Sequence, residues 1–160
     1  VNLLDLTEEE KVLSILPIKK QKNAEAAKAN FFMMATKNGV VKKTAITQYE
    51  SIRRSGIIAI KLSAGDSLRW AKLTSGTDLV FSVSKRGMSI KFNEKDVRPM
   101  ARDTMGVRGI KLRPGDELIG MDVIARDNDH ADLLVVTEKR KQLHMPTILL
   151  QKNWGFRFHM

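Results

Sequence analysis

Cysteine is absent from this chain of 160 residues, which excludes disulfides and thiolate metal sites and suits a cytoplasmic protein. No apolar run approaches the ~20 residues that a membrane helix needs, and no secretory signal pattern opens the sequence. The three histidines, His130, His144 and His159, are too dispersed for a metal site, and no phosphate-binding glycine loop occurs. Nothing here supports catalysis, so we expect a non-catalytic protein that binds no metal, cofactor or membrane.

The composition has an excess of positive charge. The chain has 28 basic and 18 acidic side chains, for a net charge of +10. Residues 1–30 are balanced, whereas residues 31–78 carry eight basic side chains against three acidic ones. Such a field favours polyanions, and nucleic acid is the commonest polyanionic partner in the cytosol. The charge therefore favours nucleic-acid binding over an acidic protein partner or simple solubility.

A unit of about fifty residues occurs twice in succession. Gly39 matches Gly87 at an offset of 48, and Ile60-Lys61-Leu62 matches residues 110–112 at an offset of 50. Two blocks in register, separated by a two-residue insertion, are hard to obtain by chance. A period near fifty indicates a propeller or a solenoid, in which each unit buries its apolar face against its neighbours.

This unit divides the chain into five parts. Full copies cover residues 31–78 and 79–130. Residues 1–30 resemble the closing half of a preceding unit followed by an exposed connector, and residues 131–138 resemble the opening strand of a further unit. Residues 139–160 form a tail. Because the chain starts in mid-unit, we expect it to be a piece of a longer array.

Each full copy has the pattern of about four antiparallel strands. In the first copy, strands at 31–36 and 40–46 flank Asn38-Gly39, a strong hairpin signal because both turn positions need positive φ. A third strand at 57–62 is expected to turn into a fourth at 68–73, and the second copy has counterparts in the same order. The fold class is therefore all-β.

Several other residues are expected to be structural. Asp66 and Asp116 occupy equivalent Gly-Asp turns, so turn chemistry is favoured over catalysis. Tyr49, Trp70 and Trp154 are expected to pack in the protein, although the two tryptophans have base stacking as an alternative. The predicted blade core consists of Phe31, Phe32, Met33, Met34, Phe81, Met88 and Phe92.

Four segments resemble the C-terminal domain of the DNA gyrase A subunit. They are residues 101–112 (Ala-Arg-Asp-Thr-Met-Gly-Val-Arg-Gly-Ile-Lys-Leu), residues 38–44, residues 59–62 and residues 1–4. The similarity extends over about residues 1–138, with the motifs in that family's order. It implies a β-pinwheel, a propeller-like disc of four-stranded blades in which neighbouring blades exchange a strand. It also implies a basic rim that wraps duplex DNA in an ATP-dependent type II topoisomerase, which then introduces negative supercoils.

The resemblance implies partners as well. They are the remaining part of the gyrase A subunit, together with the gyrase B subunit, in a cytoplasmic, nucleoid-associated bacterial enzyme. The family's disc has six blades, so this chain supplies a partial set. Two alternatives remain: the equivalent domain of topoisomerase IV, and a propeller-like scaffold that binds acidic proteins or associates with itself without binding DNA.

The chain departs from the family pattern at two places. The family's Gln-Arg-Arg-Gly-Gly-Lys-Gly box would precede Val1, and residues 51–56 only echo it. After Glu138 the family's Asn-Gly turn is replaced by Lys-Arg-Lys-Gln. We therefore expect residues 139–160 to be poorly ordered or to pack in a manner that the repeats do not share.

Basic side chains on loops and exposed strand faces are the candidates for phosphate contact. Arg53 and Arg54, with Arg98 and Arg102 in the equivalent loop, come first because loops carry function and arginine offers a planar fork to phosphate oxygens. The competing interpretation is a charged edge that discourages aggregation. The predicted DNA-binding residues are Lys42, Lys43, Arg53, Arg54, Lys61, Lys85, Arg86, Lys91, Arg98, Arg102, Arg108 and Lys111.

Overall fold

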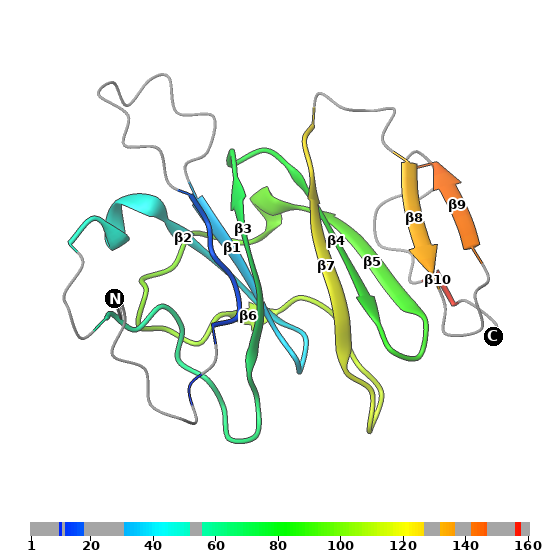
Figure 1. The fold of residues 1–160 in the computed structure, drawn as a ribbon, viewed down its shortest axis with the longest axis horizontal. Coiled ribbons are helices and arrows are strands. Elements are labelled where there is room, and N and C mark those ends of the chain that lie inside the picture. Colours follow the sequence, from blue (N-terminus) through cyan, green and yellow to red (C-terminus); the bar gives the residue numbers. More distant parts are fainter. Residues whose placement is uncertain are drawn as a thin grey trace.

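The computed structural model describes residues 10, 12–17, 31–51 and 56–126, together with the backbone of three strands closer to the C-terminus (Figure 1). The elements are β1 (Phe31–Thr36), β2 (Val40–Ala45), the 3-10 helix η2 (Ile46–Tyr49), β3 (Leu68–Thr74), β4 (Leu79–Ser84), β5 (Met88–Asn93), the 3-10 helix η3 (Glu94–Asp96), β6 (Val107–Arg108), β7 (Leu118–Ile124), β8 (Asp132–Val136), β9 (Gln142–Pro146) and β10 (Phe156–Arg157). The strands form two four-stranded sheets, β3-β1-β2-β6 and β10-β5-β4-β7, and the pair β8-β9.

The first blade is built on the predicted hairpin. β1 and β2 pair antiparallel across Asn38-Gly39, and Gly39 has a φ of +80°, as the turn requires. The Thr36 hydroxyl closes the turn by accepting a hydrogen bond of 3.2 Å from the Val40 backbone N–H. β3 pairs with the other edge of β1, with an irregularity of register between Ala35 and Thr36.

The second blade repeats these features. β4 pairs with β5 and β7 as β1 pairs with β2 and β3, and its register shift between Val83 and Ser84 lies 48 residues after the one in β1. The Ser84 hydroxyl accepts a hydrogen bond of 3.2 Å from the Met88 N–H, in the place of Thr36. The prediction of two equivalent all-β units is therefore confirmed.

Neighbouring blades exchange a strand. β6 belongs to the second repeat but completes the sheet of the first, where Val107 pairs with Val41 and Arg108 with Val40. Gly106 permits the close approach, because its φ is +92° and a Cβ there would lie 2.6 Å from the Val41 carbonyl oxygen. This exchange gives the fold the β-pinwheel arrangement.

The described strands near the C-terminus repeat the same arrangement, so the prediction that the tail packs in its own manner is wrong for residues 142–146 and 156–157. β9 pairs antiparallel with β8, and β10 pairs with β5 so that Phe156 meets Ser89 and Arg157 meets Met88. These pairings mirror those of β6 on β2, residue for residue. The physical reason is that the outer edge of β5 offers unpaired backbone N–H and C=O groups, which another strand satisfies without a particular sequence.

The predicted strand at residues 57–62 is wrong as secondary structure. Its repeat counterpart is a strand only at Val107–Arg108, where it meets β2 of the preceding blade. Among the described residues, no β2-like strand of an earlier blade is available to residues 57–58. The segment keeps its packing, since Ile60 is buried like its counterpart Ile110.

Alternation along the strands divides the apolar side chains between two clusters. Met33, Ala35 and Val41 of the first blade pack with second-blade residues that include Val80 and Phe92. Phe32 and Met34 point to the other side, where the Tyr49 ring meets Phe32 edge-on at 5.1 Å. The predicted core is largely confirmed, with Phe31 and Met88 half-buried, and so is the packing role of Tyr49. Trp70 packs partly buried against the first cluster, whereas Trp154 lies outside the described residues.

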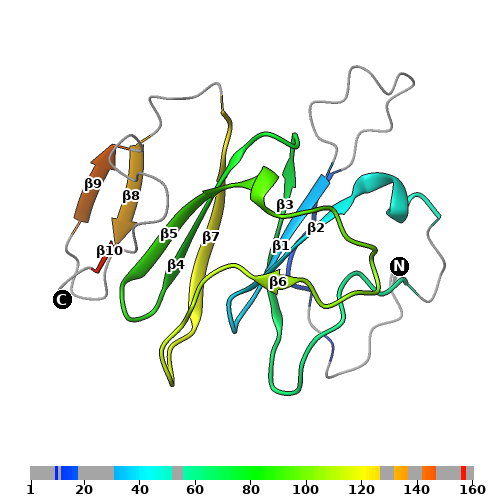
Figure 2. The same cartoon turned by 180° about the vertical axis from the view of Figure 1, so that it is seen from behind.

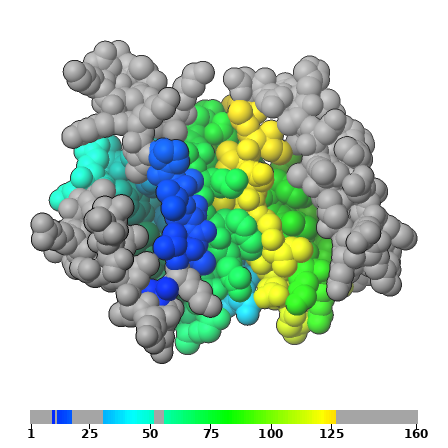
Figure 3. Space-filling view, in the orientation of Figure 1, coloured from blue at the N-terminus to red at the C-terminus, as the bar shows by residue number. Residues whose placement is uncertain are grey.

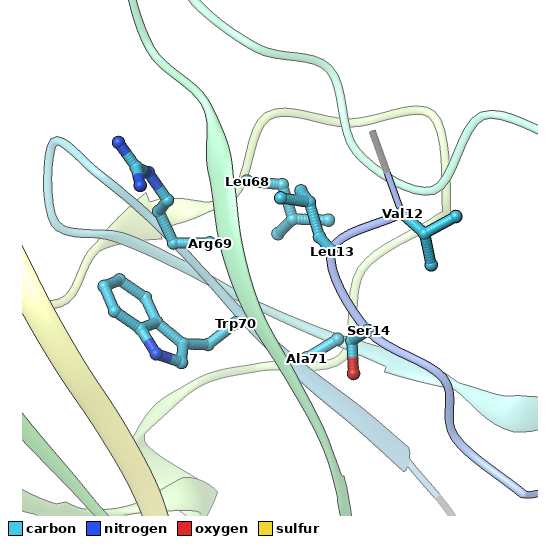
Figure 4. A pocket seen from close by; sticks show the side chains of 7 residues that line it. All are labelled: Val12, Leu13, Ser14, Leu68, Arg69, Trp70 and Ala71. Atoms are coloured by element: carbon cyan, nitrogen blue, oxygen red, sulfur yellow. The ribbon is translucent and has the colours of Figure 1, made fainter. Parts of the chain in front are cut away.

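The segment 12–17 and the closing strands β3 and β7 of the two full units lie side by side. Figure 3 shows three adjacent bands on one face, residues 12–17 in blue, β3 in green and β7 in yellow. The Lys72 ammonium lies 3.2 Å from the Asp122 carboxylate and joins β3 to β7. Figure 4 shows the recess between the first two bands, lined by Val12, Leu13, Ser14, Leu68, Arg69, Trp70 and Ala71. Within the described part of the chain, no helix is long and apolar enough to cross a membrane.

Candidate nucleic-acid interface

A long connection of the second repeat runs along the outer edge of the first blade. The Met100 N–H donates to the Lys43 carbonyl oxygen at 2.8 Å, and the Gly109 N–H donates to the Gly39 carbonyl oxygen at 2.9 Å. Between these points β6 is paired with β2. Figure 2 shows this yellow-green run leaving the second blade, passing β2 and returning toward β7. Residues 98–111 therefore form the rim of the first blade.

Basic side chains predominate on this rim. Arg98, Arg108 and Lys111 are exposed, and Arg102 is half-buried with its backbone N–H bonded to the Gln48 side chain at 2.9 Å. Residues 98–113 contain five basic side chains and a single acidic one. The rim therefore has a local excess of positive charge that faces solvent.

Lys61 of the first repeat joins the same rim. Its backbone N–H donates to the Thr104 carbonyl oxygen at 3.0 Å, and its side chain is exposed. The recurrence of Lys61 and Lys111 at one repeat position thus has a structural counterpart. We use the name outer-edge basic surface for Lys61, Arg98, Arg102, Arg108 and Lys111.

Lys42 lies in a different environment from the one that the sequence suggested. Its side chain is 0% exposed, and its ammonium donates to the carbonyl oxygens of Ala59 (2.9 Å), Thr104 (3.0 Å) and Arg102. Burial lowers the pKa of this ammonium from its ordinary value, and the nearby Asp103 opposes that shift. These contacts argue against the predicted phosphate contact, because all three donors of the ammonium already have acceptors inside the protein.

Lys43 is likewise buried, at 4% exposure. Its ammonium donates to the Glu94 backbone carbonyl at 2.6 Å and lies 5.2 Å from the centre of the Phe31 ring. Burial lowers the pKa of this lysine, while the charges of Glu94 and Asp96 oppose the shift. This burial argues against phosphate contact by Lys43, since its charged end lies against Glu94 of the second repeat.

The remaining predicted residues lie elsewhere or outside the described residues. Lys85 and Arg86 are exposed at the β4–β5 turn, where the Lys85 ammonium is 3.2 Å from the Glu117 carboxylate. Lys91 is half-buried on β5, and burial lowers its pKa. Arg53 and Arg54 lie outside the described residues, so their role stays a prediction.

The two repeat-equivalent aspartates stabilise turns. The Asp66 carboxylate accepts from the backbone N–H groups of Asn38 (3.0 Å) and Ser67 (2.8 Å). Asp116 accepts in the same way from Arg86 (3.1 Å) and Glu117 (2.9 Å). The structural interpretation is confirmed for both. In the described ranges no three His, Asp or Glu side chains gather as metal ligands.

Sequence reasoning missed two glutamates that connect the blades. Glu94 is 0% exposed and accepts a hydrogen bond of 3.0 Å from the Asp78 N–H, while its own carbonyl receives Lys43. Glu117 lies 3.5 Å from the Lys37 ammonium of the first blade and 3.2 Å from Lys85 of the second. No signal in one sequence would have found them, because each partner lies on a separate turn or strand.

These features define a class of protein: a pinwheel of repeated, strand-exchanged four-stranded blades with a basic outer edge. The family described as "DNA gyrase C-terminal domain, beta-propeller" matches residues 30–75 and 78–125, one match for each full repeat. The chain belongs to this DNA gyrase C-terminal domain family.

Individual relatives agree with the family match. The chain is 43% identical over 123 residues to the DNA gyrase A subunit of Escherichia coli, and 38% identical over 126 residues to that of Synechocystis. These alignments cover 77% and 78% of this chain but only 14% of either relative. The chain therefore spans about one-seventh of the length of these relatives.

Solved structures agree as well. The C-terminal domain of a DNA topoisomerase IV matches 96% of this chain and 46% of its own with a TM-score of 0.81 and 25% identity. A DNA gyrase A C-terminal domain matches 96% of this chain and 48% of its own with a TM-score of 0.73 and 26% identity. Both matches extend past the residues covered by the family match, in keeping with the strand pairings of the tail.

Proposed function

We propose that this chain is a non-catalytic module that binds and bends duplex DNA along its outer edge. It would act within the A subunit of a cytoplasmic bacterial type II topoisomerase. Its protein partners would be the B subunit, together with the rest of the A subunit. The observation that carries the proposal is the outer-edge basic surface, which lies on the strand-exchanged rim of the blade. Membership of the gyrase C-terminal domain family supports it.

The chemistry of this surface suits phosphates more than base edges. Its members are long, flexible or forked cations on one exposed edge, and such groups supply most of the contacts that position DNA. Neutralising phosphates releases counterions, so affinity would be sequence-tolerant and strongly dependent on salt. Preference among DNA sequences would then follow from how readily each one bends.

A gyrase-type subunit is favoured over a topoisomerase IV subunit by sequence. The matching family is that of the DNA gyrase C-terminal domain, and the gyrase A subunits of E. coli and Synechocystis are 43% and 38% identical to the chain. The two solved domains do not separate the candidates, because their identities are 26% for gyrase and 25% for topoisomerase IV. The two candidates differ in the parent enzyme, whereas the DNA-binding surface proposed for this chain is the same in either case.

The test is the affinity of the chain for unrelated duplexes, measured by fluorescence anisotropy across a salt series. We expect similar affinities for all duplexes and a log–log salt slope of about −0.9 for each phosphate neutralised. A circularised duplex of the same sequence should bind more tightly than the linear one, because its bend is already made. Binding that is absent at low salt, or indifferent to salt, would refute the proposal.

Self-association is a second candidate, supported by a different observation. Ile15 and Ile58 are large apolar residues that are 85% and 65% exposed. Both side chains would lose exposed apolar surface if another blade or another copy packed against them. Light scattering over a range of concentrations tests it, and a mass that stays monomeric throughout would reject it.

A further inference from the structure

Two consecutive lysines on β2 send their ammonium groups into the second repeat. Neighbouring residues on a strand point to opposite faces, so Lys42 and Lys43 leave the sheet on different sides. Lys42 reaches the carbonyl oxygens of Arg102 and Thr104, and Lys43 reaches the carbonyl oxygen of Glu94. The two side chains therefore hold the two ends of a single connection, residues 94–106.

The middle of this connection is fixed to the same strand. The Met100 N–H donates to the Lys43 carbonyl at 2.8 Å, and Pro99 forms a bridge with Lys43. Two members of the outer-edge basic surface lie on this connection: Arg98 between the contacts of the two ammonium groups, and Arg102 at a contact of Lys42. The positions of both arginines thus depend on where the two lysines hold the backbone.

We propose that Lys42 and Lys43 are positioning residues, which fix the connection 94–106 and so present Arg98 and Arg102 to DNA without touching it themselves. The DNA part of this inference rests on the proposed function. A free loop would lose conformational entropy when it binds, and a loop that is already held in place loses less. The two lysines would then contribute to DNA affinity through pre-organisation.

The contacts of Lys42 argue against an alternative role as a ligand group. An ammonium has three N–H donors, and those of Lys42 are directed at three carbonyl oxygens. To reach a phosphate, Lys42 would have to leave a site where it is 0% exposed and give up its three hydrogen bonds to carbonyl oxygens. Hydrogen bonds from a charged donor are among the stronger ones in proteins, so the internal site is the stable one.

The Lys42 contact distinguishes this junction from the next one. At an offset of 48, Lys42 corresponds to Ile90 and Lys43 to Lys91. Isoleucine has no donor, so the second blade lacks the counterpart of the Lys42 contact. The connection 94–106 is therefore held at both ends by lysines, a feature that the repeat does not impose on every blade.

Positioning and direct contact predict different salt dependence. If a lysine neutralises a phosphate, its removal lowers the log–log slope by about 0.9. If it only holds the loop, the complex still neutralises the same phosphates, and affinity falls at an unchanged slope. We expect Lys42→Met and Lys43→Met each to weaken binding about tenfold with the slope of the wild type.

Two matched variants calibrate this measurement. Lys95→Met removes the same charge from an exposed position on the same connection, and we expect little change in affinity. Arg98→Ala removes a proposed phosphate contact, and we expect the slope to fall by about 0.9. The positioning role is rejected if Lys42→Met and Lys43→Met lower the slope as Arg98→Ala does, or leave affinity at the level of Lys95→Met.

Two measurements on the protein without DNA test the positioning role even if the chain binds no DNA. Hydrogen exchange should show faster exchange at the Met100 and Thr104 amides in both methionine variants, with the β4 amides unchanged. In the folded wild type without DNA, an amine-acylating reagent should modify Lys61, which is exposed, and spare Lys42 and Lys43.

These outcomes separate the two proposals. If the wild-type chain binds no DNA but both DNA-free results hold, the positioning role of the lysines stands and the proposed function falls. If Lys42 and Lys43 are acylated as readily as Lys61 in free protein and become protected when DNA is added, the positioning role is overturned and direct contact takes its place. The acylation experiment uses wild-type protein, so it still distinguishes positioning from direct contact if a methionine variant does not fold.

Discussion

The Asp116 carboxylate accepts a hydrogen bond of 2.7 Å from the Ser84 hydroxyl, and this contact joins the two turns of the second blade. Ser84 in turn accepts from the Met88 N–H at 3.2 Å, while Asp116 accepts from the N–H groups of Arg86 and Glu117. One carboxylate thus satisfies three donors. The first blade uses Asp66 and Thr36 at the same positions, so the repeat preserves turn chemistry along with the apolar pattern.

Replacing Asp116 by alanine should destabilise the fold. The change leaves two turn N–H groups and the Ser84 hydroxyl without their acceptor, and we expect the unfolding free energy to fall by about 1–3 kcal/mol in urea titrations. Asp122→Ala serves as the control, because the Asp122 side chain is 64% exposed and loses only an ion pair with Lys72, which should contribute less than about 1 kcal/mol, and an exposed hydrogen bond from the Val123 N–H. Equal losses in the two variants would contradict this interpretation of the turn.

Glu117 should make stability depend on pH. The hydrogen bond from Lys85, together with the charges of Lys85 and Lys37, holds the pKa of the Glu117 carboxyl below its ordinary value. The unfolded chain therefore binds more protons between the two pKa values, so this contribution is present above the unfolded pKa and is lost as pH falls through the folded one. Glu117→Gln should be less stable than wild type at neutral pH, and the difference should close as the pH falls through the lowered pKa of Glu117.

The check is urea unfolding of both proteins from neutral to acidic pH. A Lys37→Met/Lys85→Met variant should return the Glu117 pKa, followed by carboxyl NMR, toward its ordinary value. A stability difference between wild type and Glu117→Gln that persists unchanged at low pH would show that the carboxylate acts through packing and not through its charge.

The DNA-binding role of Arg53 and Arg54 remains a prediction, because both residues lie outside the described part of the chain. Replacing both by alanine should weaken DNA binding similarly for unrelated duplexes and flatten the salt slope by roughly one to two units. The fold should survive, as circular dichroism would verify. Glu50→Ala is the matched control, because Glu50 is an exposed neighbour of opposite charge and its removal should not reduce affinity. An unchanged slope in the double variant would exclude these arginines from the interface.

The sequence alone predicted the repeat, the hairpins and the turn aspartates because each depends on local chemistry. Asn38-Gly39 needs positive φ at its glycine, and the Gly-Asp turns need a side-chain acceptor, whatever surrounds them. Strand exchange could be predicted only from the resemblance to the family, since no local sequence signal indicates that Val107 pairs with another blade. The tail was mispredicted for the same reason, because backbone pairing at the edge of β5 is insensitive to side-chain motif.

The candidate site divides along similar lines. The exposure of rim residues such as Arg98 and Lys111 could be predicted because charge on a loop or strand face usually remains in solvent, and their contact with DNA stays a prediction. Lys42 and Lys43 were misplaced because charge argues for solvent, and only the neighbouring blade supplies the carbonyl oxygens that make their burial favourable. A basic pair in one sequence does not reveal whether its acceptors are phosphates or the protein's own backbone.

Gly106 and Gly56 offer a matched test of strand exchange, because they occupy the same repeat position at an offset of 50. Both have positive φ, +92° and +72°, so alanine costs about 1–2 kcal/mol of backbone strain at either site. They differ in surroundings: a Cβ on Gly106 would lie 2.6 Å from the Val41 carbonyl oxygen, whereas one on Gly56 meets nothing within 4 Å.

Gly106→Ala should therefore lose about 3 kcal/mol or more of unfolding free energy, and Gly56→Ala only about 1–2 kcal/mol. The excess in Gly106→Ala arises because β6 has to move away from β2, which breaks the pairing that joins the two blades. Hydrogen exchange at the Val107 amide should accelerate in that variant and stay unchanged in Gly56→Ala. Equal stability losses, with the Val107 amide protected in both, would mean that β6 does not depend on the close approach at Gly106.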